Sequence, residues 1–179
     1  MDSKAVAIFS EKSAKSVDKL LSMKIVVMSD THGNVQLAVK ALRQNGKVDR
    51  LIHLGDHYRD AVAIAVGTRL HVDAVSGNTD ISSEPWADRE KILELDGVRI
   101  LITHGDIYKV KHGIDRLLEK AIEEDVQAVL FGHTHIAMKL RIGNILFLNP
   151  GCILSNNSGN SYALLTLTKG LVEGEIIKI

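Results

Sequence analysis

The sequence has little of several residue types, and each shortage excludes a class of protein. The single cysteine, Cys152, allows no internal disulfide bond, which favours a reducing, cytoplasmic location. No apolar run reaches the roughly 18 residues that span a membrane, and the N-terminus does not read as a secretory signal. The 22 basic residues balance the 22 acidic ones and aromatics are only 4% of the chain. We therefore expect neither a membrane partner nor a nucleic-acid partner that needs a basic, base-stacking surface.

The composition is that of a globular protein with one main domain. The chain has 179 residues, of which 45% are hydrophobic and 25% charged. Residues 1–22 are rich in Lys and Ser and differ in composition from the rest of the chain, so we predict an N-terminal extension there and a domain over 24–179. The extension could be a surface helix, an interaction arm or a stretch upstream of an alternative start.

Five apolar runs, each with the length and the Val, Ile and Leu content of a buried strand, break off into polar residues. The runs are 25–32, 51–56, 72–78, 100–105 and 128–135. The polar residues at their ends are Asp30, His32, Asp56, Asn78, His104, His133 and His135. In open α/β sheets ligands bind outside the carboxyl ends of the strands. We therefore expect these side chains to converge at one edge.

The remaining pattern predicts a mixed α/β fold. Helical periodicity follows the first two polar loops and recurs over 114–122, as expected of βα units with parallel strands. Tight-turn signals occur within 91–102, 139–148 and 161–179, which indicates antiparallel hairpins as well. Two mixed sheets packed together, with helices outside, accommodate both.

The polar residues are metal-ligand types. Asp30 and His32 stand two apart, as do His133 and His135, so each pair can face one ion. Carboxylate, amide and imidazole donors suit Mn²⁺, Fe or Zn²⁺, and the lack of thiolates argues against a structural zinc cage. Two carboxylates about 4–5 Å apart repel each other strongly unless a cation lies between them. The pattern therefore predicts divalent metal, and more than one ion.

These motifs resemble a known family. The segments DTHGN (30–34), GD (55–56), GNTD (77–80), HG (104–105) and GHTH (132–135) are similar to those of the calcineurin-like metallophosphoesterase superfamily, in particular its small bacterial and archaeal phosphodiesterase branch. The segments NPG (149–151) and SYALLTL (161–167) also look like that branch. The resemblance covers about residues 24–179 and implies a four-layer α-β-β-α sandwich of two mixed β-sheets.

The resemblance also implies an activity. It suggests a phosphodiesterase acting on a small phosphate ester, with a hydroxide held between two divalent metals as the nucleophile. Manganese is the expected metal, with zinc, iron, nickel and magnesium as alternatives. In the family pattern Asp30, His32 and His135 hold one ion, Asn78, His104 and His133 hold the other, and Asp56 bridges them. Asp56, Asn78 and His133 are the expected catalytic residues.

Two departures leave questions open. Many superfamily members have His where this chain has Thr79, so the leaving group would be protonated by water or by a nearby His, or activated leaving groups would be preferred. Asp106 stands where related chains often have His, which puts the substrate contacts in doubt. Thr79 and Asp80 are expected to support the ligands from behind.

Other functions and residues also remain as hypotheses. The alternative function is a non-catalytic interaction scaffold, because a eukaryotic retromer subunit has the same fold, and self-association into a homo-oligomer is left open. We expect His53 to be a hydrogen-bonded core residue, whereas His57 could face the site or solvent. Trp86 is expected in a loop, packing locally, at a subunit contact or at the edge of a pocket.

Overall fold

The computed structural model describes residues 22–155 and 158–179, so the predicted extension lies outside the described residues except for Ser22. Within them, ten strands form two five-stranded sheets. The first sheet has the order β10-β9-β1-β2-β3. Its strands are β1 (Met23–Met28), β2 (Arg50–His53), β3 (His71–Ala74), β9 (Ser161–Thr168) and β10 (Leu171–Lys178).

The second sheet has the order β4-β5-β6-β8-β7. Its strands are β4 (Glu90–Leu95), β5 (Val98–Thr103), β6 (Ala128–Phe131), β7 (Met138–Ile142) and β8 (Ile145–Asn149). Both sheets are mixed: β1, β2 and β3 run parallel in the first, and β5, β6 and β8 in the second, while the other strands pair antiparallel.

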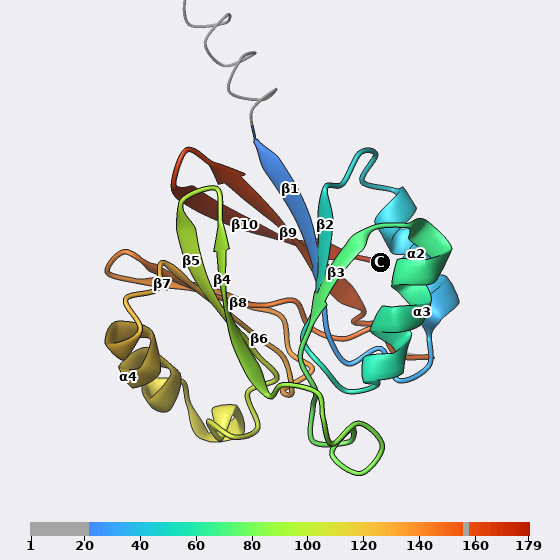
Figure 1. The fold of residues 1–179 in the computed structure, drawn as a ribbon, viewed down its shortest axis with the longest axis horizontal. Helices are drawn as coiled ribbons and strands as arrows, with labels where there is room; N and C mark the ends of the chain where they lie inside the picture. The colour runs from blue at the N-terminus through green and yellow to red at the C-terminus, as the bar shows by residue number, and fades with distance from the viewer. Residues whose placement is uncertain (1–21, 156–157) are drawn as a thin grey trace, which may run out of the picture.

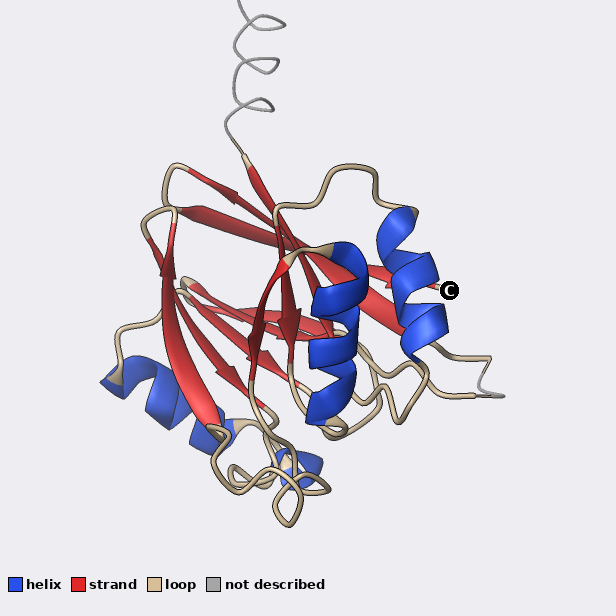
Figure 2. Cartoon of the chain, turned by 45° about the vertical axis from the view of Figure 1, so that its right-hand side comes forward, coloured by secondary structure: helices blue, strands red, loops and turns tan. Residues whose placement is uncertain are grey.

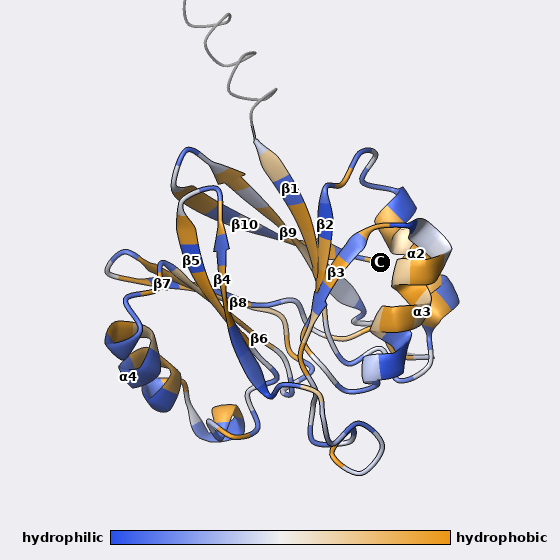
Figure 3. Ribbon diagram, in the orientation of Figure 1, coloured by the Kyte–Doolittle hydropathy of each residue, from blue (hydrophilic) through white to orange (hydrophobic). Residues whose placement is uncertain are grey.

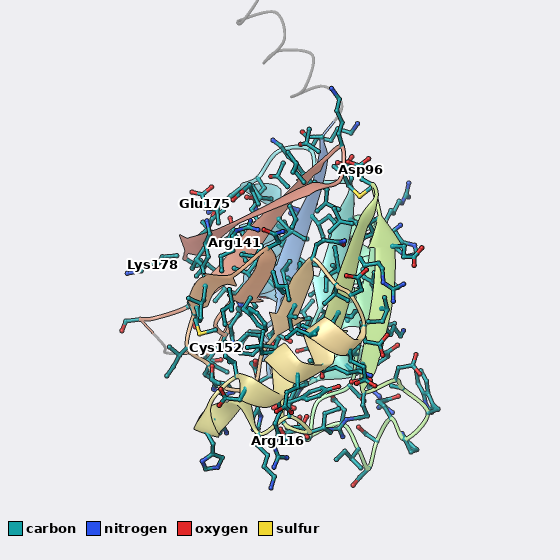
Figure 4. The ribbon with its side chains drawn as sticks, turned by 90° about the vertical axis from the view of Figure 1, so that its left-hand side faces the viewer. Asp96, Arg116, Arg141, Cys152, Glu175 and Lys178 are labelled. Atoms are coloured by element: carbon teal, nitrogen blue, oxygen red, sulfur yellow. The ribbon has the colours of Figure 1, made fainter. Side chains whose placement is uncertain are left out.

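The predicted hairpins are confirmed. Asp96 and Gly97 join β4 to β5 with φ of 49° and 76°, and Lys169 and Gly170 join β9 to β10 with φ of 50° and 81°. Two-residue turns with positive φ at both positions match the right-handed twist of the strands that they connect. At the open edge where the sheets approach each other, Arg141 of β7 donates to the carbonyl of Val172 in β10 at 2.7 Å (Figure 4).

Alternation along the strands builds the layers. In β1, Ile25 and Val27 face the second sheet, whereas Val26 and Met28 face the helices. The apolar side chains between the two sheets form the largest core cluster, and Figure 3 shows the hydrophobic colour on the inner strands as well as on α2 and α3. A strand buried on both faces needs apolar residues at every position, which explains the unbroken hydrophobic runs.

Helices cover the outer faces of the sheets (Figures 1 and 2). α2 (Val35–Arg43) and α3 (Tyr58–Thr68) cover the first sheet, α4 (Asp115–Glu123) covers the second, and a short 3₁₀ turn, η1 (Val110–His112), precedes α4. This is the expected four-layer α-β-β-α sandwich. No helix in the described part of the chain is long and apolar enough to cross a membrane.

One helix departs from its predicted pattern. The amphipathic stripe over 114–122 places Leu117 and Ala121 in the core, but Ile122 is 66% exposed. α4 is only nine residues long, so its contact with the sheet covers a narrow band and the last apolar position points away from it.

Candidate metal centre

The polar residues at the strand ends do converge. The carboxyl ends of the parallel strands of both sheets lie at the same end of the molecule (Figure 2). There Asp30, His32, Asp56 and His135 each offer a ligand atom, and these four atoms all lie within 4.8 Å of one another. The four residues come from loops after β1, β2 and β6. The cluster therefore joins the two sheets.

Two further histidines extend the cluster. Nε2 of His104, which follows β5, lies 3.4 Å from Oδ1 of Asp56 and 3.9 Å from Oδ1 of Asp30. Nδ1 of His133 lies 3.1 Å from Nε2 of His104. Six of the seven predicted ligands thus form one contiguous group. His104 is fully buried and forms the floor of the group, which solvent does not reach. His133 is half-buried and His135 is exposed, and these two residues form its mouth, which is open to solvent.

The seventh predicted ligand, Asn78, is exposed beside Asp56. Its neighbours make the contact: the backbone N–H and hydroxyl of Thr79 donate to Oδ1 of Asp56 at 3.1 and 2.9 Å. Asp80 accepts from the N–H groups of Gly77 and Tyr58, which fixes the loop. The expected supporting contacts of Thr79 and Asp80 are therefore present in the structure.

Asp56 occupies the centre of the group. Its Oδ2 lies 3.8 Å from Nε2 of His32, and its Oδ1 faces His104 on the other side. The two oxygens of one carboxylate are thus directed at two different imidazoles, each from a different sheet. A carboxylate in this position can be shared by two cations.

The backbone of these loops is strained. Five of the seven predicted ligands have positive φ: Asp30 at 53°, His32 at 43°, Asp56 at 52°, His133 at 67° and His135 at 60°. Such values cost energy for residues with a Cβ and are uncommon outside turns. The other non-glycine examples lie mainly in hairpin turns and at helix ends. The strained residues therefore gather in one cluster. This indicates that the orientation of these side chains is maintained at the expense of favourable backbone conformations.

Two glycines are needed for space. Gly77 and Gly132 directly precede proposed ligands, and neither has a positive φ. A Cβ on Gly77 would lie 2.1 Å from Oδ1 of Asp56, and one on Gly132 would lie 1.9 Å from Oγ of Ser29. Gly55, which precedes Asp56, does have a positive φ, of 92°. Close approach between loops of different strands is invisible in the sequence.

A buried hydrogen-bonded network holds the first ligand loop. Nε2 of His53 lies 3.0 Å from Oγ1 of Thr31, which donates to Oδ2 of Asp60 at 2.6 Å. The N–H of Gly33 donates to the same oxygen at 2.7 Å. His53 is the expected hydrogen-bonded core residue, and its burial lowers its pKa from 6.5 to about 4. No signal in the sequence pointed to Asp60, which lies in a helix as an ordinary surface residue would.

Partners also orient the ligands of the second sheet. Nδ1 of His104 lies 2.8 Å from the carbonyl of Leu54. A carbonyl only accepts, so Nδ1 carries the proton and Nε2 presents its lone pair to the cluster. The amide of Asn149, in the NPG segment, donates to the carbonyl of Gly132 at 2.9 Å and supports the loop that carries His133.

The electrostatics favour a cation. Burial would raise the pKa of Asp30, but the hydrogen bond from His135 and the charge of His104 outweigh burial and the pKa is lowered. The same hydrogen bond raises the pKa of His135. Burial, with His104 and Lys111 nearby, lowers the pKa of His133 and keeps it neutral. A carboxylate held in its charged form at Asp30, beside a neutral imidazole at His133, suits a divalent ion.

Two buried polar atoms at the centre are poorly satisfied. Among the described residues, Nε2 of His32 has no hydrogen-bond partner, and Oδ1 of Asp30 has only Nε2 of His135, at 3.0 Å. Buried polar atoms are almost always satisfied, and an exception needs an explanation. Both atoms lie within the four-residue group, where a bound metal ion would satisfy them. The residues present therefore fit a metal.

The open questions about neighbouring residues are partly resolved. The ring of His57 lies 5.0 Å from that of His32, so His57 borders the centre and is exposed. Asp106 forms an ion pair with Arg89 at the start of β4, on the side where His104 leaves β5. Cys152 is buried, and its thiol donates to the carbonyl of His135 at 3.7 Å.

Comparison with known proteins defines the class. Residues 23–170 match the calcineurin-like phosphoesterase superfamily domain. The chain therefore belongs to the calcineurin-like phosphoesterase superfamily. It is 32% identical over 148 residues to the probable metallophosphoesterase YsnB of Bacillus subtilis, covering 81% of this chain and 85% of that one. It is 30% identical to the phosphodiesterase MJ0936 of Methanocaldococcus jannaschii over 72% of this chain and 83% of that one.

Solved structures agree with this assignment. A predicted phosphoesterase from Streptococcus pneumoniae has a TM-score of 0.68 and 29% identity over 87% of this chain and 98% of that one. Vps29 of Entamoeba histolytica has a TM-score of 0.65 but only 22% identity over 88% of this chain and 99% of that one, which shows a shared fold alone.

Proposed function

We propose that this metallophosphoesterase is a phosphodiesterase that binds two divalent ions at the strand ends and hydrolyses a small phosphate ester. Asp30, His32 and His135 would hold one ion and Asn78, His104 and His133 the other, with Asp56 shared. The observation that carries the proposal is the placement of Asp56, whose two oxygens face His32 and His104 on opposite sides. Two ions bound in this way would activate a water molecule and neutralise charge on the phosphoryl oxygens.

The side chains around the ions have separate tasks. Thr79 donates two hydrogen bonds to one oxygen of Asp56 and so sets the direction of the carboxylate. His104 is locked by the carbonyl of Leu54 and excludes water from the floor of the site. His133 and His135 lie at the mouth, where a phosphate ester would approach. Since the pKa of His133 is lowered, its imidazole stays neutral there and can donate to or accept from the substrate.

The alternative scaffold function has support from the Vps29 fold likeness only. This chain retains both Asp56 and Asn78 at their positions, together with the buried Nε2 of His32, which has no hydrogen-bond partner among the described residues. A surface used only for protein contact would not need buried polar atoms without partners. The donor set therefore favours the enzyme.

The test is manganese-dependent hydrolysis of bis(p-nitrophenyl) phosphate, together with metal content by elemental analysis. We expect two ions per chain, turnover that a chelator abolishes, and loss of both in Asp56→Ala. Glu175→Ala, on the exposed face of β10 far from the centre (Figure 4), is the matched control and should behave as wild type. Undiminished turnover in Asp56→Ala would refute the shared carboxylate. No turnover with manganese, zinc, iron, nickel or magnesium would favour the scaffold.

A further inference from the structure

The loop between β3 and β4 exposes the only tryptophan of the chain. Trp86 is 68% exposed, whereas Phe131, Phe147 and Tyr162 are at most 2% exposed. The loop, green at the bottom of Figure 1, lies at the same end of the molecule as the metal centre. A large aromatic ring left in water forgoes the stabilisation that burial would give it. The ring is therefore available to a ligand at the same end of the molecule as the metal centre.

Two ring contacts, one on Trp86 and one on the proposed ligand His32, involve neighbouring residues of the chain. The ring of Tyr58 packs edge-on against Trp86, with centroids 5.4 Å apart and an interplanar angle of 87°. Tyr58 directly follows His57, whose ring lies 5.0 Å from that of His32. The backbone N–H of Tyr58 donates to Asp80 at 2.9 Å, in the same loop as Asn78. Tyr58 is therefore held by the segments that carry the proposed ligands.

The backbone that carries Trp86 is held on both sides of it. Glu84, only 5% exposed, forms an ion pair with Arg59 of α3 and accepts the N–H of Ala87 at 3.0 Å. The hydroxyl of Ser76, just before Gly77, donates to the carbonyl of Ala87 at 3.1 Å. The loop is thus tied to α3 and to the segment that carries Asn78. A ring presented by a fixed backbone binds with less loss of conformational freedom.

We propose that Trp86 and Tyr58 form a stacking subsite for a flat aromatic group on one arm of the substrate, such as a nucleobase or an aryl ester. The proposal rests on the proposed function, because the phosphate of the same molecule would lie at the metal centre. One tryptophan and one tyrosine accommodate a single ring system. The ligand is therefore a small aromatic phosphate ester and not a polymer, which agrees with the balanced charge of the chain.

The single tryptophan provides the test, because its fluorescence reports this loop alone. The probes are adenosine 5′-monophosphate and ribose 5-phosphate, which share the phosphate and sugar but differ in the base. With the manganese-loaded protein we expect adenosine 5′-monophosphate to quench Trp86 and to bind about tenfold more tightly by calorimetry, the usual size of one base–aromatic stack. Ribose 5-phosphate should bind without quenching.

Variants separate stacking from folding. Trp86→Ala should abolish the difference in affinity between the two probes, and Trp86→Phe should keep most of it. Val66→Ala, which truncates an exposed side chain near the other end of α3, should leave it unchanged. Equal affinities in the wild type, no binding of either probe, or a difference that survives Trp86→Ala would overturn the proposal. So would a change in oligomeric size in Trp86→Ala without a change in probe affinity, since Trp86 would then be a self-contact. These binding measurements need no turnover, so they fail independently of the hydrolysis assay.

Discussion

Gly77→Ala tests whether close packing between loops sets the position of Asp56. The added Cβ would lie 2.1 Å from Oδ1 and 2.5 Å from the backbone nitrogen of Asp56, and ordinary contacts begin near 3.4 Å. Because the backbone nitrogen cannot swing away as a flexible side chain would, the two loops must separate by about 0.9 Å, from 2.5 to 3.4 Å, to reach an ordinary contact. A displacement of about 1 Å in a catalytic group typically costs on the order of 100-fold in rate.

The assay measures kcat/KM for bis(p-nitrophenyl) phosphate with manganese, and metal content in the same preparation. We expect a loss on the order of 100-fold, reduced metal content, and destabilisation of about 1–3 kcal/mol from overpacking, measured by urea unfolding. Gly67→Ala is the control: a Cβ there meets no atom within 4 Å, and the residue lies inside α3. It should keep full activity and gain up to about 1 kcal/mol, because alanine is the better helix former.

Both variants replace a glycine with an alanine, and only Gly77→Ala places the new Cβ against Asp56. The comparison therefore separates the effect of the contact from that of the added methyl group. If Gly77→Ala binds metal and turns over within about twofold of wild type, the contact between Gly77 and Asp56 does not position the carboxylate, and close approach between the loops has no part in directing it.

Two further predictions concern pH and metal. Burial lowers the pKa of His53 from 6.5 to about 4, so on acidification the unfolded chain binds the proton first; the stability is complete above pH 6.5 and falls as the pH drops toward 4, by about 3 kcal/mol at most. Denaturant unfolding in the presence of chelator should show this slope in wild type and not in His53→Gln, and identical slopes would contradict it. Saturating manganese, at about 100 times its Kd, should stabilise the protein by about 2.7 kcal/mol and raise its Tm by about 5–10 °C over the chelated form. The same addition should have little effect on Asp56→Ala, and an equal rise there would point to metal binding elsewhere.

The sequence was sufficient for the layers of the fold and for the convergence of the ligands. Buried parallel strands need apolar runs without interruption, and their carboxyl ends lie on one edge, so Asp30 and His104 could be placed together before any coordinates. Asp-Gly between strands sets a turn through local backbone preferences alone, as Asp96 and Gly97 show. Each of these signals is local in the chain.

The missed features are contacts between distant segments. Asp60 supports Thr31 across 29 positions, and Gly77 approaches Asp56 from a different strand. Asn34 stands at the start of α2 but makes no side-chain cap; its amide donates to the carbonyls of Thr31 and Ile153 instead. Asn is a residue type that favours helix N-caps, but at Asn34 the side chain bonds to a distant segment instead. Neither the periodicity nor the spacing of residues in the sequence shows which of the possible hydrogen-bond partners a side chain will choose.

The contacts behind the ligands also explain how a strained, charged centre persists. Positive φ values and facing carboxylates both oppose the arrangement, and neither is relieved by the sheets themselves. Separate anchors offset this cost in each loop: Asp60 holds the N–H of Gly33, Leu54 holds His104, and Asn149 holds the carbonyl of Gly132. Each anchor is a buried polar group: Asp60 lies in α3, Asn149 ends β8 and the carbonyl of Leu54 directly follows β2. The group that each anchor holds would lose its partner if the loop relaxed. The proposed ligands are therefore directed by the protein scaffold, and a bound cation would complete a geometry that the fold already imposes.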